Sequence, residues 1–385
     1  MPFEFINTHI QARQQDALLR KRHVVQSATA RTITVNNTTY LNFASNDYLG
    51  FGEYKLNLEQ SQALGSHSSP LVTGYQAQQQ QLEHYLCEQL GYEAGMLFNS
   101  GFSANSSVIK ALFQDKAAAQ NSAIFQDKLN HASLIDGAMH SNAALVRFNH
   151  NDLKHLRSRL EKSKAHNKLI ISEGVFSMDG DIAPLKELLA LAKEHNAWLM
   201  IDDAHGFGAL GKTGLGSCEA LLEEGFALPD ILVITFGKAV ASSGACVLAN
   251  NQFINYMLQF NRDYTYSTAM SPLIAALTLS RLKAVKSAND KRQQLSSNIA
   301  FFKQLCKKHA IAVMESSTAI QPIVLGCAEQ TLKAAEQLKK QGIWLTAIRP
   351  PTVAHNTARL RVTLTAAHTH TDISKLVEQL KGAIA

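Results

Sequence analysis

A lysine and two aspartates follow apolar segments that have the composition of buried strands. Lys238 comes directly after ILVITFG (231–237), and Asp202 and Asp203 end WLMIDD (198–203). In open α/β sheets the ligand binds at the carboxyl ends of the strands, so both sites are expected at that edge. A lysine with its ordinary pKa of about 10.4 is charged at neutral pH, and a Schiff base with an aldehyde removes that obstacle to chemistry. The alternative interpretation is that Lys238 is an ordinary solvated loop lysine, which is the commoner case among lysines in general.

The pair Lys238 and Asp202 suits pyridoxal 5′-phosphate (PLP). This cofactor needs a lysine for its Schiff base and a carboxylate beside its pyridinium nitrogen, which keeps the ring able to accept electrons. We choose Asp202 because successive strand residues face opposite sides, so Asp203 should point away. The AHG that follows offers no helix that Asp202 could cap.

Residues 206–213 also satisfy two nucleotide-binding patterns, G-x-G-x-x-G and G-x-x-x-x-G-K-T. A phosphate-binding loop of either kind must open a helix. Here Lys212 and Thr213 run into GLGS (214–217), and each glycine costs a helix about 1 kcal/mol relative to alanine. We therefore expect a loop, with a P-loop NTP-binding protein as the rival hypothesis.

Composition sets the broad class. The chain has 385 residues, 46% of them hydrophobic and 18% charged, with a net charge of +6, as in a globular protein with a large core. Its basic residues are scattered, which argues against a nucleic-acid partner. Five cysteines without C-x-x-C spacing favour free thiols and no metal site. Residues 1–22 look like an amphipathic helix rather than a signal peptide, and no segment could span a bilayer, so we expect a cytoplasmic protein without membrane contact.

The order of elements predicts a doubly wound α/β domain followed by a smaller α+β domain. We expect an N-terminal helix-and-strand segment over 1–45, a large domain over 46–275 and a C-terminal domain over 276–385. Near-continuous apolar runs should form a mostly parallel sheet covered on both faces. The expected strands of the large domain are 94–98, 122–127, 144–148, 168–174, 198–203, 231–237 and 244–250.

Beyond these patterns, whole segments resemble one family. DDAHGFG (202–208) and TFGKAVASSGA (235–245) are similar to the fold-type I PLP-dependent transferases and, within them, to the α-oxoamine synthases. The resemblance extends over nearly the whole chain, through LNFASNDYLG, LFNSGFSAN, LNHASLIDG, SEGVFSMDGDIAPL, YSTAMSP, AIRPPTV and ARLRVTLT, in the order of the family. Ala239 and Ala241 depart from it, because they stand where the family has glycines.

The resemblance assigns roles residue by residue. Lys238, His131, Asp202 and His205 would be catalytic. Cofactor contacts are implied for Gly101, Phe102, His131, Ser177, Asp202, His205, Thr235, Lys238, Ser267 and Thr268, of which the last two would reach the phosphate from a second subunit. Substrate contacts are implied for Arg20, Asn46, His131, Arg349, Thr352 and Arg361, and Arg361 would pair with the amino-acid carboxylate. Taken singly, His131 could be a surface histidine, and Ser177 and Asn46 turn residues.

The resemblance is strongest to the branch of the family that serves biotin synthesis. It implies decarboxylative condensation of L-alanine with a pimeloyl thioester, carried by coenzyme A or acyl-carrier protein, in a homodimer. Another α-oxoamine synthase, using glycine or another acyl donor, is the nearest alternative. A cofactor-binding relative without catalysis is a third.

Overall fold

The computed structural model describes residues 2–53 and 63–384. The chain divides into two compact units. Of the described residues, the large unit comprises 63–177 and 182–292, and the small unit comprises 2–53, 178–181 and 293–384. The N-terminal segment thus shares a unit with the C-terminal residues.

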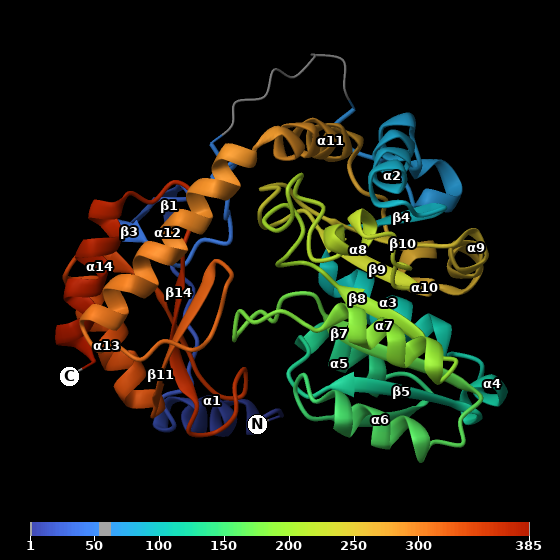
Figure 1. Cartoon of the computed structure of the whole chain (residues 1–385), viewed down its shortest axis with the longest axis horizontal. Helices are drawn as coiled ribbons and strands as arrows, with labels where there is room; N and C mark the ends of the chain where they lie inside the picture. Colours follow the sequence, from blue (N-terminus) through green and yellow to red (C-terminus); the bar gives the residue numbers. More distant parts are fainter. Residues whose placement is uncertain (1, 54–62, 385) are drawn as a thin grey trace. The chain divides into compact units, whose positions relative to one another are not determined.

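The large unit is built on a seven-stranded sheet in the order β4-β10-β9-β8-β7-β5-β6 (Figure 1). Its strands are parallel from β9 to β6, whereas β10 is antiparallel to both of its neighbours. All seven strands expected from the apolar runs are present, and the mostly parallel sheet is confirmed. They are β4 (Ala94–Phe98), β5 (Ser122–Asp127), β6 (Ala144–Phe148), β7 (Asn167–Glu173), β8 (Trp198–Asp202), β9 (Ile231–Thr235) and β10 (Ala245–Ala249).

Two layers of helices cover the sheet, because alternate strand residues are apolar on both faces. One face, which includes Ile201 and Leu232, packs against one set of helices. The other face, which includes Met200 and Val233, packs against a second set. The first set is α2 (Ala77–Leu90), α6 (Leu153–Glu161), α7 (Leu185–Glu194), α8 (Glu219–Glu223) and α11 (Pro272–Ser287). The second set is α3 (Gly101–Leu112), α4 (Lys116–Gln120), α5 (Ala132–Met139), α9 (Asn251–Phe260) and α10 (Arg262–Thr265). A π-helical turn, η1 (Pro70–Gly74), precedes α2.

The small unit contains two sheets. Strands β1 (Val25–Ala28), β2 (Thr32–Val35) and β3 (Thr38–Asn42) form an antiparallel meander, and β12 (Ile343–Trp344) joins β3 in parallel. Strand β14 (Ala358–Thr363) lies between β11 (Ile320–Gly326) and β13 (Thr346–Ile348) in an antiparallel sheet. The helices are α1 (Phe5–Gln15), α12 (Asn289–Lys308), α13 (Ala328–Lys340) and α14 (His370–Ala383), with α12 entering the small unit at Gln293.

Across residues 2–53 and 63–384, none of the helices combines the length and apolar character that crossing a bilayer requires. The five cysteines are free thiols.

Candidate active site

Asp202 ends β8 in the interior of the large unit and is held by two donors. The side-chain amide of Asn105 donates to its Oδ2 at 2.6 Å, and the backbone N–H of Ala204 donates to its Oδ1 at 3.0 Å. Asp202 is only 4% exposed. A buried carboxylate fixed in this way can pair with a cationic ring nitrogen without reorganising.

Asn105 also connects Asp202 to His131. Its amide donates to the Ser133 hydroxyl at 3.0 Å, and that hydroxyl lies 2.7 Å from Nδ1 of His131. The Ser133 backbone N–H donates to the same Nδ1, because His131 is the N-cap of α5. Desolvation lowers the pKa of His131, and the positive charge of Lys238 lowers it further, whereas Asp202 opposes the shift. The ring is therefore held neutral, with Nδ1 as the acceptor.

Lys238 is half-buried in the loop that follows β9. This is the position expected from the apolar segment that precedes it. Its ammonium is close enough to influence the pKa values of His131, Glu173 and Asp203. His205 lies buried in the turn after β8. The large unit thus gathers the four residues predicted to be catalytic around the carboxyl ends of β8 and β9.

Glu173 is a further buried acid that the sequence analysis did not single out. It ends β7 and is paired in register with Asp202 of β8. Its Oε2 accepts a hydrogen bond from the Ser177 backbone N–H at 3.3 Å, and the His131 backbone donates to it as well. Burial raises the pKa of Glu173 well above its usual range, and the charge of Asp202 raises it further. The signal that identified Asp202, an acid at the end of an apolar strand, would also have identified Glu173.

Asp203, the neighbouring acid, has hydrogen-bond partners different from those of Asp202. Its carboxylate accepts the Ser217 backbone N–H at 2.8 Å, and burial raises its pKa to about 7. It therefore holds the loop that follows β8 rather than the residues around Asp202.

That loop is the segment with the two nucleotide-binding patterns, and an acid from the same chain occupies its donors. The backbone N–H groups of Thr213 and Leu215 donate to the Glu219 carboxylate at 2.7 and 2.8 Å. Lys212 pairs with Glu223 at 3.0 Å. The next helix, α8, begins only at Glu219. A P-loop would present these N–H groups to phosphate at the start of a helix, so this segment is structural.

Helix α3 begins with Gly101 and Phe102, so its unpaired N-terminal N–H groups lie at this end. The Ser100 hydroxyl caps Ser103 N, and the positive end of the helix dipole favours a phosphate at this end. A Cβ added to Gly101 would lie 2.5 Å from Cγ2 of Thr235, so a larger residue fits here only if the Thr235 side chain moves.

Ser267 and Thr268 lie near this helix end within the same chain. With Asn99 and Ser103 among the other lining residues, they line a small cavity of about 110 Å³. The Asn99 side chain donates to the Thr268 carbonyl at 2.8 Å. The predicted contact from a second subunit remains a prediction.

In the small unit the structure brings Arg361 and Asn46 together. Arg361, 6% exposed, donates through Nη1 to Asn46 Oδ1 at 3.3 Å and to Thr363 Oγ1 at 3.0 Å. Its guanidinium also hydrogen-bonds the Tyr48 phenol; burial raises the pKa of that phenol, and Arg361 opposes the shift. A rigid planar guanidinium held by neutral oxygens is a suitable partner for a carboxylate.

Three of the four remaining predicted substrate residues form a separate group in the small unit, whereas the fourth, His131, lies in the large unit. Arg20 donates to Thr352 Oγ1 at 3.1 Å, and Arg349 donates to the carbonyl of Ala17. Desolvation lowers the pKa of Arg349, and the positive charge of Arg20 lowers it further. Two adjacent guanidinium groups favour a negatively charged ligand.

Comparison with known proteins gives the family. The model of the family "Aminotransferase class I and II" matches residues 38–380. The chain belongs to this family. Within it, the chain is 43% identical over 383 residues to the 8-amino-7-oxononanoate synthase of Vibrio cholerae, covering 98% of this chain and 96% of that protein. It is 44% identical over 392 residues to the enzyme of the same name from Marinomonas sp., covering 99% and 95%.

Solved structures share the fold. A serine palmitoyltransferase from S. paucimobilis with a bound PLP–myriocin aldimine matches with a TM-score of 0.88 at 27% identity, covering 99% of this chain and 97% of that one. The 8-amino-7-oxononanoate synthase of Francisella tularensis matches with a TM-score of 0.74 at 30% identity, covering 89% and 97%. The predicted fold type is therefore confirmed.

Proposed function

We propose that this member of the aminotransferase class I and II family is an 8-amino-7-oxononanoate synthase. The reaction is the condensation of L-alanine with a pimeloyl thioester, which gives 8-amino-7-oxononanoate, carbon dioxide and a free thiol in biotin synthesis. The observation that carries the proposal is identity of 43–44% to two enzymes of that name over nearly the full length of all three chains.

The residues of the large unit fit PLP. Asp202 offers a fixed carboxylate for the ring nitrogen, the first turn of α3 offers an anion site for the phosphate, and Lys238 offers an amine for the aldehyde. When bound, PLP supplies an aldehyde carbon for attachment of an amine and a protonated ring that accepts electrons from the amino acid's Cα.

Each protein group then has a task. Arg361 pairs with the carboxylate of L-alanine, assisted by Asn46. Nζ of Lys238, in its neutral form, takes the proton from Cα of L-alanine. The neutral ring of His131 would support the new carbonyl oxygen. Cα bonds to the thioester carbonyl carbon as the thiolate leaves and takes a proton from solvent; the carboxylate then departs as carbon dioxide, and Nζ of Lys238 returns its proton to Cα.

Arg20, Arg349 and Thr352 bind the acidic end of the pimeloyl chain or of its carrier. The carrier is coenzyme A or acyl-carrier protein. The contact between Arg20 and Thr352 and the charge repulsion between Arg20 and Arg349 support this assignment.

The enzyme acts as a cytoplasmic homodimer. An apolar surface in the large unit supports the dimer, because Leu71, Val72 and Tyr266 are exposed by 50%, 72% and 74%. Tyr266 directly precedes Ser267 in the sequence. Leu71 and Val72 follow Ser68, whose carbonyl accepts a hydrogen bond from the backbone N–H of Ala269, next to Thr268. The surface is therefore placed to bring a partner subunit near the proposed phosphate site.

A substrate panel tests the proposal. Purified enzyme with PLP is given L-alanine, glycine or L-serine together with pimeloyl or acetyl thioesters, and thiol release is measured. Best turnover of L-alanine with a pimeloyl donor is the expected result. Best turnover of glycine with the acetyl donor would replace the biotin assignment by another α-oxoamine synthase, and cofactor absorbance without any turnover would indicate a non-catalytic relative.

A further inference from the structure

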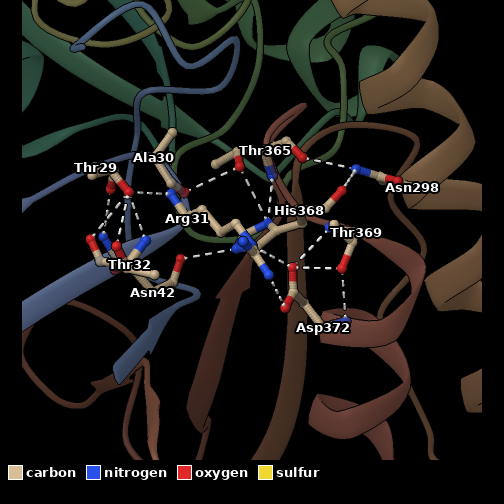
Figure 2. A network of polar contacts seen from close by, with 10 residues as sticks. All are labelled: Thr29, Ala30, Arg31, Thr32, Asn42, Asn298, Thr365, His368, Thr369 and Asp372. Atoms are coloured by element: carbon tan, nitrogen blue, oxygen red, sulfur yellow. Dashed lines mark hydrogen bonds and ion pairs between the residues drawn. The ribbon is translucent and has the colours of Figure 1, made fainter. Parts of the chain in front are cut away.

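His368 is a buried histidine of the small unit that lies outside the proposed site. It stands two residues before α14 and is 2% exposed (Figure 2). Its ring stacks on Phe43, with centroids 4.2 Å apart and planes 11° from parallel. The pKa of its ring is lowered to about 4, mainly by burial.

The hydrogen bonds of the ring define one tautomer. The backbone N–H of Thr365 donates to Nδ1 at 3.0 Å, so Nδ1 is an acceptor. Nε2 lies 3.1 Å from the carbonyl oxygen of Asn42 and must carry the proton. A charged ring would place a second proton against the Thr365 N–H, so this arrangement requires neutral imidazole.

Two titratable groups face the ring from neighbouring elements. Asp372 of α14 and Arg31 of the turn before β2 act on its pKa in opposite directions. They pair with each other, with Nε of Arg31 2.8 Å from Oδ2 of Asp372 (Figure 2). Because Arg31 and Asp372 are paired, their opposite effects on the pKa of His368 offset each other, and burial keeps the ring neutral.

Through these contacts His368 fastens the segment 42–48 to the end of β14. His368 holds the Asn42 carbonyl and the Phe43 ring at the start of the segment. The Phe43 carbonyl accepts the Thr363 N–H at 2.8 Å, and the Tyr48 carbonyl accepts the Ala366 N–H at 2.8 Å. The segment is therefore fixed at both ends.

The same segment supplies partners for Arg361. Asn46 Oδ1 accepts a hydrogen bond from its Nη1 at 3.3 Å, and the Tyr48 phenol contacts its guanidinium. We propose that His368 is a positioning residue for Arg361: it holds segment 42–48 so that Asn46 and Tyr48 orient the guanidinium for the amino-acid carboxylate. The inference rests on the proposed function, which makes Arg361 the carboxylate-binding group.

Three substitutions separate the contacts of the ring. His368→Phe keeps the ring stack and loses both hydrogen bonds. His368→Gln keeps a donor that reaches the Asn42 carbonyl, whereas His368→Asn keeps only an acceptor near Thr365. The control is His370→Gln, because His370 is an exposed histidine stacked on Phe301 that has no contact of this kind with segment 42–48.

The dissociation constant of L-alanine, read from the absorbance change of PLP-loaded protein, is the first readout. We expect a rise of about tenfold for His368→Phe and His368→Asn, a smaller rise for His368→Gln, and no change for His370→Gln. KM for L-alanine should rise with it, while KM for the pimeloyl thioester and the affinity for PLP stay constant. An unchanged L-alanine constant in folded His368→Phe would overturn the inference.

The second readout is free of cofactor and substrate. Amide hydrogen exchange of residues 43–52 in the apoprotein should be faster in His368→Phe than in the wild type and unchanged in His370→Gln. Equal exchange in His368→Phe and wild type would overturn the inference. If His368→Phe does not fold, His368→Asn takes its place, because it loses the donor to the Asn42 carbonyl, and an unchanged L-alanine constant in folded His368→Asn would overturn the inference. A wild type that shows no L-alanine response would instead count against the proposed function.

Discussion

The side-chain amide of Asn105 donates a 2.6 Å hydrogen bond to the Asp202 carboxylate, and both residues are buried. The same amide reaches Ser133, which contacts His131. One asparagine on α3 therefore fixes the acid proposed to face the ring nitrogen and, through Ser133, the side chain of His131.

Asn105→Ala should weaken PLP binding about tenfold, because loss of a buried hydrogen bond to a charged group costs about 1.5–3 kcal/mol. The measurement is fluorescence titration of apoprotein with PLP. Asn142→Ala is the matched control, since Asn142 is an exposed asparagine whose amide donates to the Gln114 carbonyl. Equal PLP affinity in Asn105→Ala and the control would refute the role given to Asn105.

Gly101 and Thr235 should behave as a coupled pair. Gly101→Ala places a methyl group 2.5 Å from Cγ2 of Thr235 and should shift the start of α3, which lowers PLP affinity. Thr235→Ser removes that Cγ2 and keeps the hydroxyl, so the double variant should recover most of the affinity. A double variant no better than Gly101→Ala would show that steric conflict with Thr235 is not the cause.

Glu83 should make stability depend on pH. It is buried, it accepts the Tyr75 hydroxyl at 2.5 Å and the Leu97 N–H at 3.1 Å, and burial raises its pKa to about 7. Since the folded state holds its proton more tightly than the unfolded state does, its contribution is fully present below pH 4.5 and is lost as the pH rises through about 7.

Glu83→Gln mimics the protonated acid and should lose this part of the pH dependence, which is at most about 1.4 kcal/mol per pH unit. Urea unfolding of both proteins at pH 5 and pH 8 measures it. The variant should gain stability relative to wild type at pH 8 compared with pH 5. If the stability difference between Glu83→Gln and wild type were the same at pH 5 and pH 8, the raised pKa assigned to Glu83 would be contradicted.

Val72→Asp should weaken the proposed homodimer. An aspartate on the exposed apolar surface of η1 must be desolvated when a partner covers it. Sedimentation velocity at micromolar protein should show a shift toward monomer. Met139→Asp, at another exposed apolar side chain of the large unit, should leave the sedimentation coefficient unchanged. A dimer of equal strength in Val72→Asp would move the interface elsewhere.

The fold of the large unit could be predicted because its strands are apolar on both faces. Runs such as ILVIT and ACVLA form β9 and β10 at the expected residues. The pairing of the strands was harder to predict. In the large unit β10 is antiparallel to β9. In the small unit β3 pairs with β12 across most of the chain, as in Leu41 with Ile343. Local patterns carry no information on such long-range pairing.

The same limit applies to the site. The positions of Asp202 and Lys238 could be predicted, because each stands at the carboxyl end of an apolar strand, the edge where open α/β sheets bind ligands. Asn105 is 97 residues from Asp202, and His368 is 326 residues from Asn42. Their roles depend on three-dimensional contacts, and nothing in their local sequence distinguishes them from helix or turn residues.

The covalent attachment point of the cofactor tests the central claim most directly. Holoprotein is reduced with borohydride, digested, and the pyridoxyl-modified peptide is identified by mass spectrometry, with Lys212 as the internal comparison on the exposed loop. We predict the modification on Lys238 alone and its loss in Lys238→Ala. Modification of another lysine, or no modification in protein that shows cofactor absorbance, would contradict the account.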